Sequence, residues 1–197
     1  QALIAGDVDI LIARDFPPRK LEQIKENSNT EAEVFTSNNA GYVTFNMELE
    51  PTDDPTVRQA LSHAIDRDRI IQDIYSGLGK KSNVPLSENL LGWAGDDVDG
   101  YPFDQEKAEA LLDEAGWTMG SGDVRQKEGE PLRLNMVSTN TPPPRMQLAE
   151  EMVAMLSEVG VDAKLTTFEY NTAYAEVRKG ETHMFYATAS WFDPDVL

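Results

Sequence analysis

The last third of the chain alternates between strand-like and helix-like segments, and this alternation limits the possible folds more than any other feature. Hydrophobic periodicity and turn residues predict strands at residues 132–136, 161–168 and 184–189, with helices from 141 to 160 and over 171–178. A strand–helix–strand–helix–strand order implies parallel pairing between the strands. We therefore predict an α/β fold, a three-layer lobe with a mixed, mostly parallel sheet.

Residues 184–189 (MFYATA) form an almost unbroken apolar run, which predicts a central strand covered on both faces. In open α/β sheets, ligands bind beyond the carboxyl ends of the strands. The candidate ligand-binding residues are therefore Ser190, Trp191, Phe192 and Asp193, which follow the run. An indole offers an apolar wall, and a carboxylate in a partly desolvated cleft binds an ammonium group. The same residues also fit a core tryptophan followed by an Asp-Pro turn.

The chain is strongly acidic, with 17 Lys and Arg residues against 35 Asp and Glu residues and a net charge of −18. This charge argues against nucleic acid or an anionic membrane as a partner, because phosphates recruit Lys and Arg. The acidic residues are spread along the chain, which favours a solvated surface suited to high salt over a patch for one basic partner. There is no Cys, so disulfides and thiol chemistry are excluded.

The first two thirds of the chain give weaker signals. Strands are predicted at residues 8–13, 32–36 and 42–47, and the last two are separated by a turn-rich segment at 37–41. One long helix is predicted from 55 to 76, capped by Asp54, and another begins after Asp104 and ends near Gly116. Residues 118–131 are predicted to be a loop or a hairpin, and a short helix is expected after Pro18.

Two segments resemble ligand-binding motifs only in part. Residues 76–82 (SGLGKKS) follow a helix rather than a strand, so we interpret them as a helix end and not as a phosphate loop. Asp97, Asp99 and Glu106 match calcium-loop offsets, but the first position is a glycine, which favours a solvated loop. His63 and His183 are interpreted as structural or surface residues. We predict no cofactor and no metal site.

Four segments resemble one protein family. Residues 54–67 (DPTVRQALSHAIDR) are the most specific of them, and residues 103–117 (FDQEKAEALLDEAGW) form a second signature. Residues 5–10 (AGDVDI) and 155–161 (MLSEVGV) add two shorter matches. On these residues the chain resembles the family 5 extracellular solute-binding proteins of ABC importers, the dipeptide and oligopeptide group.

The resemblance implies a periplasmic-binding-protein type II-like fold in which two lobes close over a solute. Residues 1–197 would be a single lobe, a fragment of a larger two-lobed protein that is not an enzyme. The implied partners are a peptide or other small solute and an ABC permease, with the protein a monomer, extracellular or periplasmic, and membrane-anchored. In the family, a carboxylate after a strand end like Ala189-Ser190-Trp191 pairs with the amino terminus of the peptide. The family spacing is W-x-x-D, whereas here Phe192 alone separates Trp191 from Asp193. Three interpretations therefore stay open: Asp193 is the amine partner, Asp195 takes this role, or the anchor is lost.

Four alternatives to a peptide receptor stay open. A receptor of the same family binding an oligosaccharide would use stacked aromatic residues, and one binding a nickel complex would use His or Arg. A metal-assisted hydrolase would use Asp97, Asp99 and Glu106. A pure interaction domain would bind a basic partner through its acidic surface, and such binding would vanish at molar salt.

Overall fold

A computed structural model of the chain describes residues 2–11, 20–35, 37–87, 89 and 98–190. Its main sheet has four strands in the order β1-β7-β5-β6, namely β1 (Asn39–Phe45), β7 (Met184–Ser190), β5 (Arg133–Thr139) and β6 (Asp162–Phe168). β5 pairs in parallel with both β6 and β7, whereas β1 runs antiparallel to β7. The predicted mixed, mostly parallel α/β sheet is confirmed.

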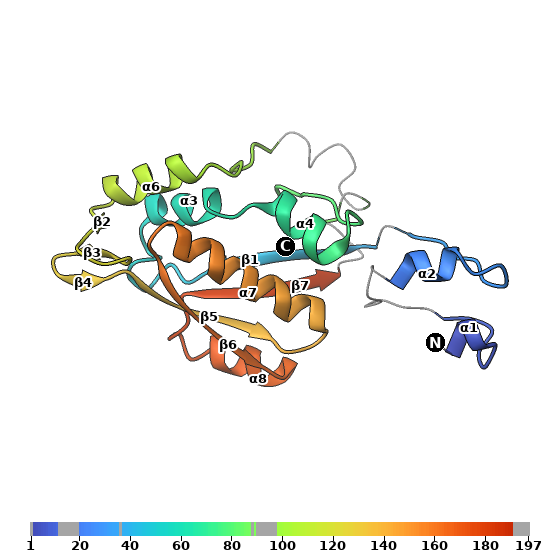
Figure 1. The fold of residues 1–197 in the computed structure, drawn as a ribbon. Helices are drawn as coiled ribbons and strands as arrows, with labels where there is room; N and C mark the ends of the chain where they lie inside the picture. The colour runs from blue at the N-terminus through green and yellow to red at the C-terminus, as the bar shows by residue number, and fades with distance from the viewer. Residues whose placement is uncertain (1, 12–19, 36, 88, 90–97, 191–197) are drawn as a thin grey trace.

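The predicted central strand is also confirmed, because β7 lies between β1 and β5 and is buried on both faces. Met184 and Tyr186 belong to the larger core, under the helices drawn above the sheet in Figure 1. Phe185 and Ala187 point to the opposite face and pack against Ala173 of the helix drawn below the sheet. A strand covered in this way needs apolar residues at every position, which explains the unbroken run in the sequence.

The helices of the last third connect the parallel strands. α7 (Pro143–Glu158) joins β5 to β6, and α8 (Tyr170–Val177) joins β6 to β7. α7 packs on one face of the sheet through Leu148, Ala149, Met152, Met155 and Leu156, whereas α8 covers the other face (Figure 1). This helix–sheet–helix arrangement is the predicted three-layer lobe.

The long helix predicted from 55 to 76 is two helices, α3 (Pro55–His63) and α4 (Arg67–Tyr75). Asp54 caps α3 as predicted, by accepting a hydrogen bond from Thr56 N at 2.7 Å. Asp66 adopts an extended backbone and caps α4 by accepting from Arg69 N, so it ends one helix run and begins the next. The apolar stripe continues across this break, so the hydrophobic periodicity predicted one helix instead of two.

The remaining elements follow the prediction with changed boundaries. α6 (Gln105–Glu114) begins after the Asp104 cap, as predicted. β1 begins at Asn39, so part of the predicted turn belongs to a strand, because residues 39–41 pair with residues 188–190 of β7. The 118–131 segment is a small three-stranded sheet of β2 (Thr118–Met119), β3 (Arg125–Lys127) and β4 (Glu130–Pro131).

The predicted strands at 8–13 and 32–36 are wrong for the residues that the structure describes. Residues 8–11 and 32–35 form no strand, and Ile10 and Phe35 are 79% and 78% exposed. A strand needs a neighbouring strand for its backbone hydrogen bonds, and the described part of the chain offers none there. This region contains the short helices α1 (Ala2–Ala5) and α2 (Leu21–Lys25) and extends away from the sheet (Figure 1). None of the helices described meets the length and hydropathy needed to cross a bilayer.

Candidate functional site

The carboxyl ends of β5 and β7 lie side by side, because the two strands are parallel neighbours in the sheet. We call this place the rim and define it by Thr139, Arg145, Tyr170, Tyr174, Thr188 and Ser190. Ser190 ends β7 and is exposed, as expected for a residue that a ligand could reach. Trp191, Phe192, Asp193 and Asp195 lie outside the described residues, so the predicted indole and carboxylate stay predictions.

Arg145 is the charged side chain at the rim. It lies in the first turn of α7, immediately after β5, where Pro143 and Pro144 begin the helix. Its Nη1 donates to Thr139 Oγ1 of β5 at 3.1 Å, and its Nη2 donates to Thr188 Oγ1 of β7 at 2.5 Å. The guanidinium therefore bridges the ends of two neighbouring strands.

Aromatic rings of α8 form the side of the rim next to β6. Tyr170 is 51% exposed, and its ring centroid lies 4.8 Å from that of Tyr174. Tyr174 in turn meets Phe185 edge to face at 5.0 Å. Burial, followed by a hydrogen bond with Tyr170, raises the pKa of Tyr174 to about 12. Its phenol therefore stays neutral near pH 7 and can act as a hydrogen-bonding wall.

Both histidines are structural, as predicted. His63 is buried, and its Nδ1 lies 2.6 Å from Pro102 O, which makes Nδ1 the protonated nitrogen because a carbonyl can only accept. His183 Nδ1 accepts from Asn135 N, and its Nε2 donates to Glu50 O. Backbone groups thus occupy Nδ1 of His63 and both ring nitrogens of His183.

The calcium-like loop is only partly visible. Asp97 lies outside the described residues, and Asp99 and Glu106 are exposed. Across the residues whose structure is described, no group of three His, Asp or Glu side chains is placed to hold a metal ion. The residues that the structure describes therefore give the hydrolase alternative no support.

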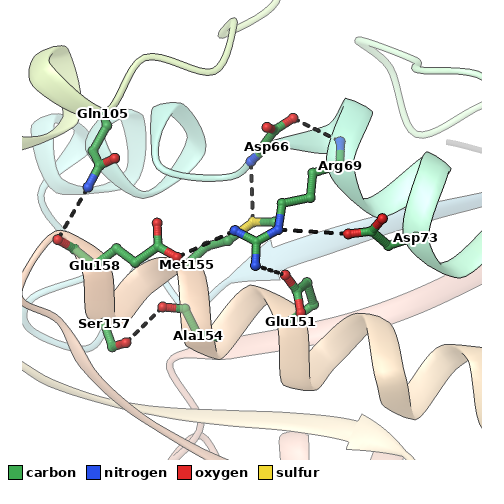
Figure 2. Close-up of polar contacts among 9 residues, drawn as sticks. All are labelled: Asp66, Arg69, Asp73, Gln105, Glu151, Ala154, Met155, Ser157 and Glu158. Atoms are coloured by element: carbon green, nitrogen blue, oxygen red, sulfur yellow. Dashed lines mark hydrogen bonds and ion pairs between the residues drawn. The ribbon is translucent and has the colours of Figure 1, made fainter.

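A second polar cluster lies away from the rim, between α4 and α7 (Figure 2). Arg69 of α4 contacts Glu151 at 2.5 Å and Glu158 at 3.4 Å, both on α7, and Asp73 on its own helix at 3.9 Å. We call these four residues the Arg69 cluster. Next to it, Asp66 N donates to Met155 Sδ at 3.3 Å. These contacts fix α4 on the outer face of α7.

Two cavities lie away from the rim. One, of about 270 Å³, is lined by residues at the start of β7 and the end of β1, among them Phe45, Asn46 and His183. It therefore lies at the opposite ends of the strands from the rim. The other, of about 390 Å³, lies between α1 and residues 29–31 in the N-terminal part.

Ser190 is the rim residue predicted from the sequence, whereas Thr139, Arg145, Tyr170, Tyr174 and Thr188 were not predicted. The sequence did indicate the location of Arg145, because it lies in the first turns of the helix predicted after the strand at 132–136, near the carboxyl ends already assigned to ligands. The carboxyl ends of all parallel strands, and not only of the last one, are candidate ligand positions, which places Arg145 near the site but does not reveal its contacts.

Comparison with known proteins assigns the chain to a family. The family model described as bacterial extracellular solute-binding proteins, family 5 Middle, matches residues 1–196. The dipeptide-binding protein of Escherichia coli (strain K12) is 32% identical over 182 residues, which are 90% of this chain and 32% of that protein. Heme-binding protein A of Haemophilus influenzae is 30% identical over 180 residues, which are 91% of this chain and 31% of that protein. The chain thus spans about a third of the length of these curated relatives.

Solved structures agree with this assignment. NikA from Brucella suis in complex with Fe(III)-EDTA matches with a TM-score of 0.88 and 30% identity, over 98% of this chain and 40% of that one. A dipeptide-binding protein from Pseudoalteromonas sp. SM9913 in complex with Met-Leu matches with a TM-score of 0.76 and 25% identity, over 99% of this chain and 36% of that one. The fold is therefore of the periplasmic-binding-protein type II class. The chain belongs to the family 5 bacterial extracellular solute-binding proteins.

Proposed function

We propose that this chain is one lobe of the substrate-binding component of an ABC importer and that the solute binds at the rim. The observation that carries this proposal is the meeting of β5 and β7 at an edge that presents a guanidinium, threonine hydroxyls and neutral phenols. These groups bind and orient a solute. The rest of a longer protein would supply the facing wall, and closure of the two lobes would present the loaded form to a membrane permease.

A peptide is the solute that we favour. Peptides carry amides, a terminal ammonium and a terminal carboxylate, and the rim offers hydrogen-bonding groups and a cation. The predicted carboxylate at Asp193 or Asp195 would take the ammonium group. The relatives named as dipeptide-binding proteins support this choice. The protein would work outside the cell as a membrane-anchored monomer.

A chelated metal ion is the second candidate, and Arg145 is the observation that favours it. A chelator such as EDTA presents several carboxylates, which suit a guanidinium. The solved relative with bound Fe(III)-EDTA supports this candidate. The metal would then be cargo held by its own chelator, which requires no metal ligand from the protein.

Thermal unfolding of the full-length protein with a ligand panel tests the proposal. The panel contains di- to pentapeptides, oligosaccharides, and Ni(II)-histidine and Fe(III)-EDTA complexes. A ligand present at 100 times its Kd adds about 2.7 kcal/mol to the free energy of unfolding, enough to raise Tm by several degrees. We expect peptides to raise Tm and to be recovered intact by mass spectrometry. A shift with sugars alone would end the peptide proposal, a shift with chelates alone would select the second candidate, and cleaved peptides would indicate an enzyme.

A further inference from the structure

Tyr186 is a tyrosine buried in the middle of an apolar core. It belongs to the larger core cluster and is 5% exposed. A buried hydroxyl costs free energy unless it finds a hydrogen-bond partner, and the partner here is Tyr75, the last residue of α4. Burial raises the pKa of Tyr186 above its usual range, so the phenol stays neutral and can donate this bond. A pair of phenols therefore ties α4 to the central strand β7.

Gly41 of β1 makes room for the Tyr186 hydroxyl. A Cβ atom at Gly41 would lie 2.7 Å from Tyr186 Oη and 3.4 Å from its Cε2 and Cζ atoms. A glycine inside a strand weakens the strand, and it often marks a place where another group approaches closely. Gly41 does not have a positive φ, so the glycine is required by the close approach of Tyr186 and not by backbone conformation.

Gly41 and Tyr186 lie directly behind the rim. Gly41 is the register partner of Thr188, which follows two residues after Tyr186 on β7. Side chains two residues apart on a strand point to the same face, so Tyr186 and Thr188 are neighbours on the face that α7 covers. Thr188 Oγ1 accepts the hydrogen bond of 2.5 Å from Arg145. The position of this rim hydroxyl therefore depends on how Tyr186 packs over β1.

α4 is itself anchored away from the rim. Its amino end is bound to the carboxyl-terminal half of α7, through Asp66 N and Met155 Sδ and through the Arg69 cluster (Figure 2). Its carboxyl end is Tyr75, which bonds to Tyr186 of β7. α4 is thus held at both ends, and it braces the end of β7 against α7.

We propose that Tyr186 is a positioning residue of the solute site. Its hydroxyl, seated over Gly41 and bonded to Tyr75, holds the end of β7 in the geometry that a solute meets. Tyr186 is buried and acts through Thr188 at the rim, as a supporting residue behind the groups that contact the solute. This inference rests on the proposed function, because a positioning role requires that a solute binds at the rim.

Isothermal titration calorimetry on the full-length protein tests the positioning role. The probes are the panel ligands that raise Tm, beginning with the dipeptide Met-Leu and with Fe(III)-EDTA, which two solved relatives bind. Tyr186→Phe removes only the hydroxyl and should weaken binding by about 3- to 10-fold, the range expected for one hydrogen bond. The protein stays folded at 25 °C in this variant, so a loss of stability alone would not change the Kd.

Thr52→Val is the matched control for the loss of a buried hydroxyl. Thr52 is fully buried, and its Oγ1 donates to Asn46 O at 2.7 Å, at the opposite ends of the strands from the rim. Thr52→Val should lower Tm about as much as Tyr186→Phe, because each variant loses a buried hydrogen bond. It should leave the Kd unchanged within about 2-fold.

Thermal unfolding tests the pairing of Gly41 with Tyr186 without any solute. Gly41→Ala places a methyl group against the Tyr186 hydroxyl, so it should lower Tm by about 3 °C or more. In a Tyr186→Phe background the remaining ring atoms lie at 3.4 Å, an ordinary contact, and the same change should shift Tm by no more than about 1 °C. Tyr75→Phe breaks the phenol pair from the other side, so adding it to Tyr186→Phe should lower Tm little further.

The outcomes separate this inference from the function on which it rests. Equal changes in Kd for Tyr186→Phe and Thr52→Val, or a Gly41→Ala effect that is the same in both backgrounds, would overturn the positioning role and leave the solute-binding role standing. Failure of every panel ligand to bind the wild-type protein would overturn both. A selective loss of affinity in Tyr186→Phe, together with a Gly41→Ala effect that depends on the Tyr186 hydroxyl, would support the inference.

Discussion

The two ends of α7 hold arginines in opposite surroundings. In its carboxyl-terminal half, Glu151 and Glu158 of α7 join Asp73 around Arg69, which approaches from α4 (Figure 2). At its amino end, Arg145 meets only the hydroxyls of Thr139 and Thr188 among the described side chains. Both arginines are held in place, but among the described side chains carboxylates neutralise the charge of Arg69 and not that of Arg145.

This difference separates an arginine that stabilises the fold from one that can bind a solute. Carboxylates around Arg69 compensate its charge and join two helices. The interactions of that cluster therefore stabilise the folded protein and leave no uncompensated charge for a ligand. Hydroxyls around Arg145 orient the guanidinium without cancelling its charge, which leaves the cation available to a solute. Substitution at Arg69 should therefore affect stability, whereas substitution at Arg145 should affect binding.

Arg125 extends the comparison to an arginine with no ligand role and gives the largest expected effect. Its side chain is 3% exposed and donates to Val159 O and Trp117 O, both at 2.8 Å, and to Asp113. Arg125→Met leaves two buried carbonyls and a carboxylate without their donor, so the free energy of unfolding should fall by about 3 kcal/mol. Urea denaturation measures this loss, and a change below about 1 kcal/mol would show that the buried clamp is dispensable.

Arg69→Gln should have an intermediate effect. It leaves Asp73, Glu151 and Glu158 near one another without their shared cation, which should reduce the free energy of unfolding by about 1–2 kcal/mol at low salt. Molar salt screens the repulsion between carboxylates, so the loss should shrink there. The control is Arg133→Gln, which breaks one exposed pair with Asp162 and should cost at most about 0.5 kcal/mol. Equal losses in the two variants would contradict a cooperative cluster.

Arg145→Gln should have the smallest effect on stability. Loss of two hydrogen bonds to hydroxyls is offset by removal of a cation from the amino end of α7, so the free energy of unfolding should change by no more than about 0.5 kcal/mol. Urea denaturation of the ligand-free protein measures it. A loss as large as that of Arg69→Gln would place Arg145 among the structural arginines and remove the contrast between the two ends of α7.

The sequence predicted the lobe well where the signals are local. β5, α7, β6, α8 and β7 were predicted because apolar periodicity, prolines and glycines mark their limits. The break between α3 and α4 was missed because Asp66 caps α4 inside a continuous apolar stripe. The strands predicted at 8–13 and 32–36 failed in their described residues because a strand depends on a partner, which apolar alternation cannot reveal.

The sequence predicted the location of the site better than it predicted the residues that form it. The carboxyl edge of β7 followed from one apolar run, and Ser190 lies there. Arg145 was missed because its importance depends on contacts with Thr139 and Thr188, which are 6 and 43 residues away in sequence. Nothing local to Arg145 distinguishes a neutralised arginine from one held by hydroxyls, because that distinction is made by tertiary packing.

Hydrogen–deuterium exchange of the full-length protein, with and without its stabilising ligand, tests the central claim most directly. If the solute binds at the rim, the ligand should slow exchange in residues 138–146 and 186–190, where β5, β7 and the first turn of α7 meet. Residues 44–46 and 180–183, around the cavity at the opposite edge of the sheet, should exchange at unchanged rates. Protection around that cavity, with none at the ends of β5 and β7, would contradict the account.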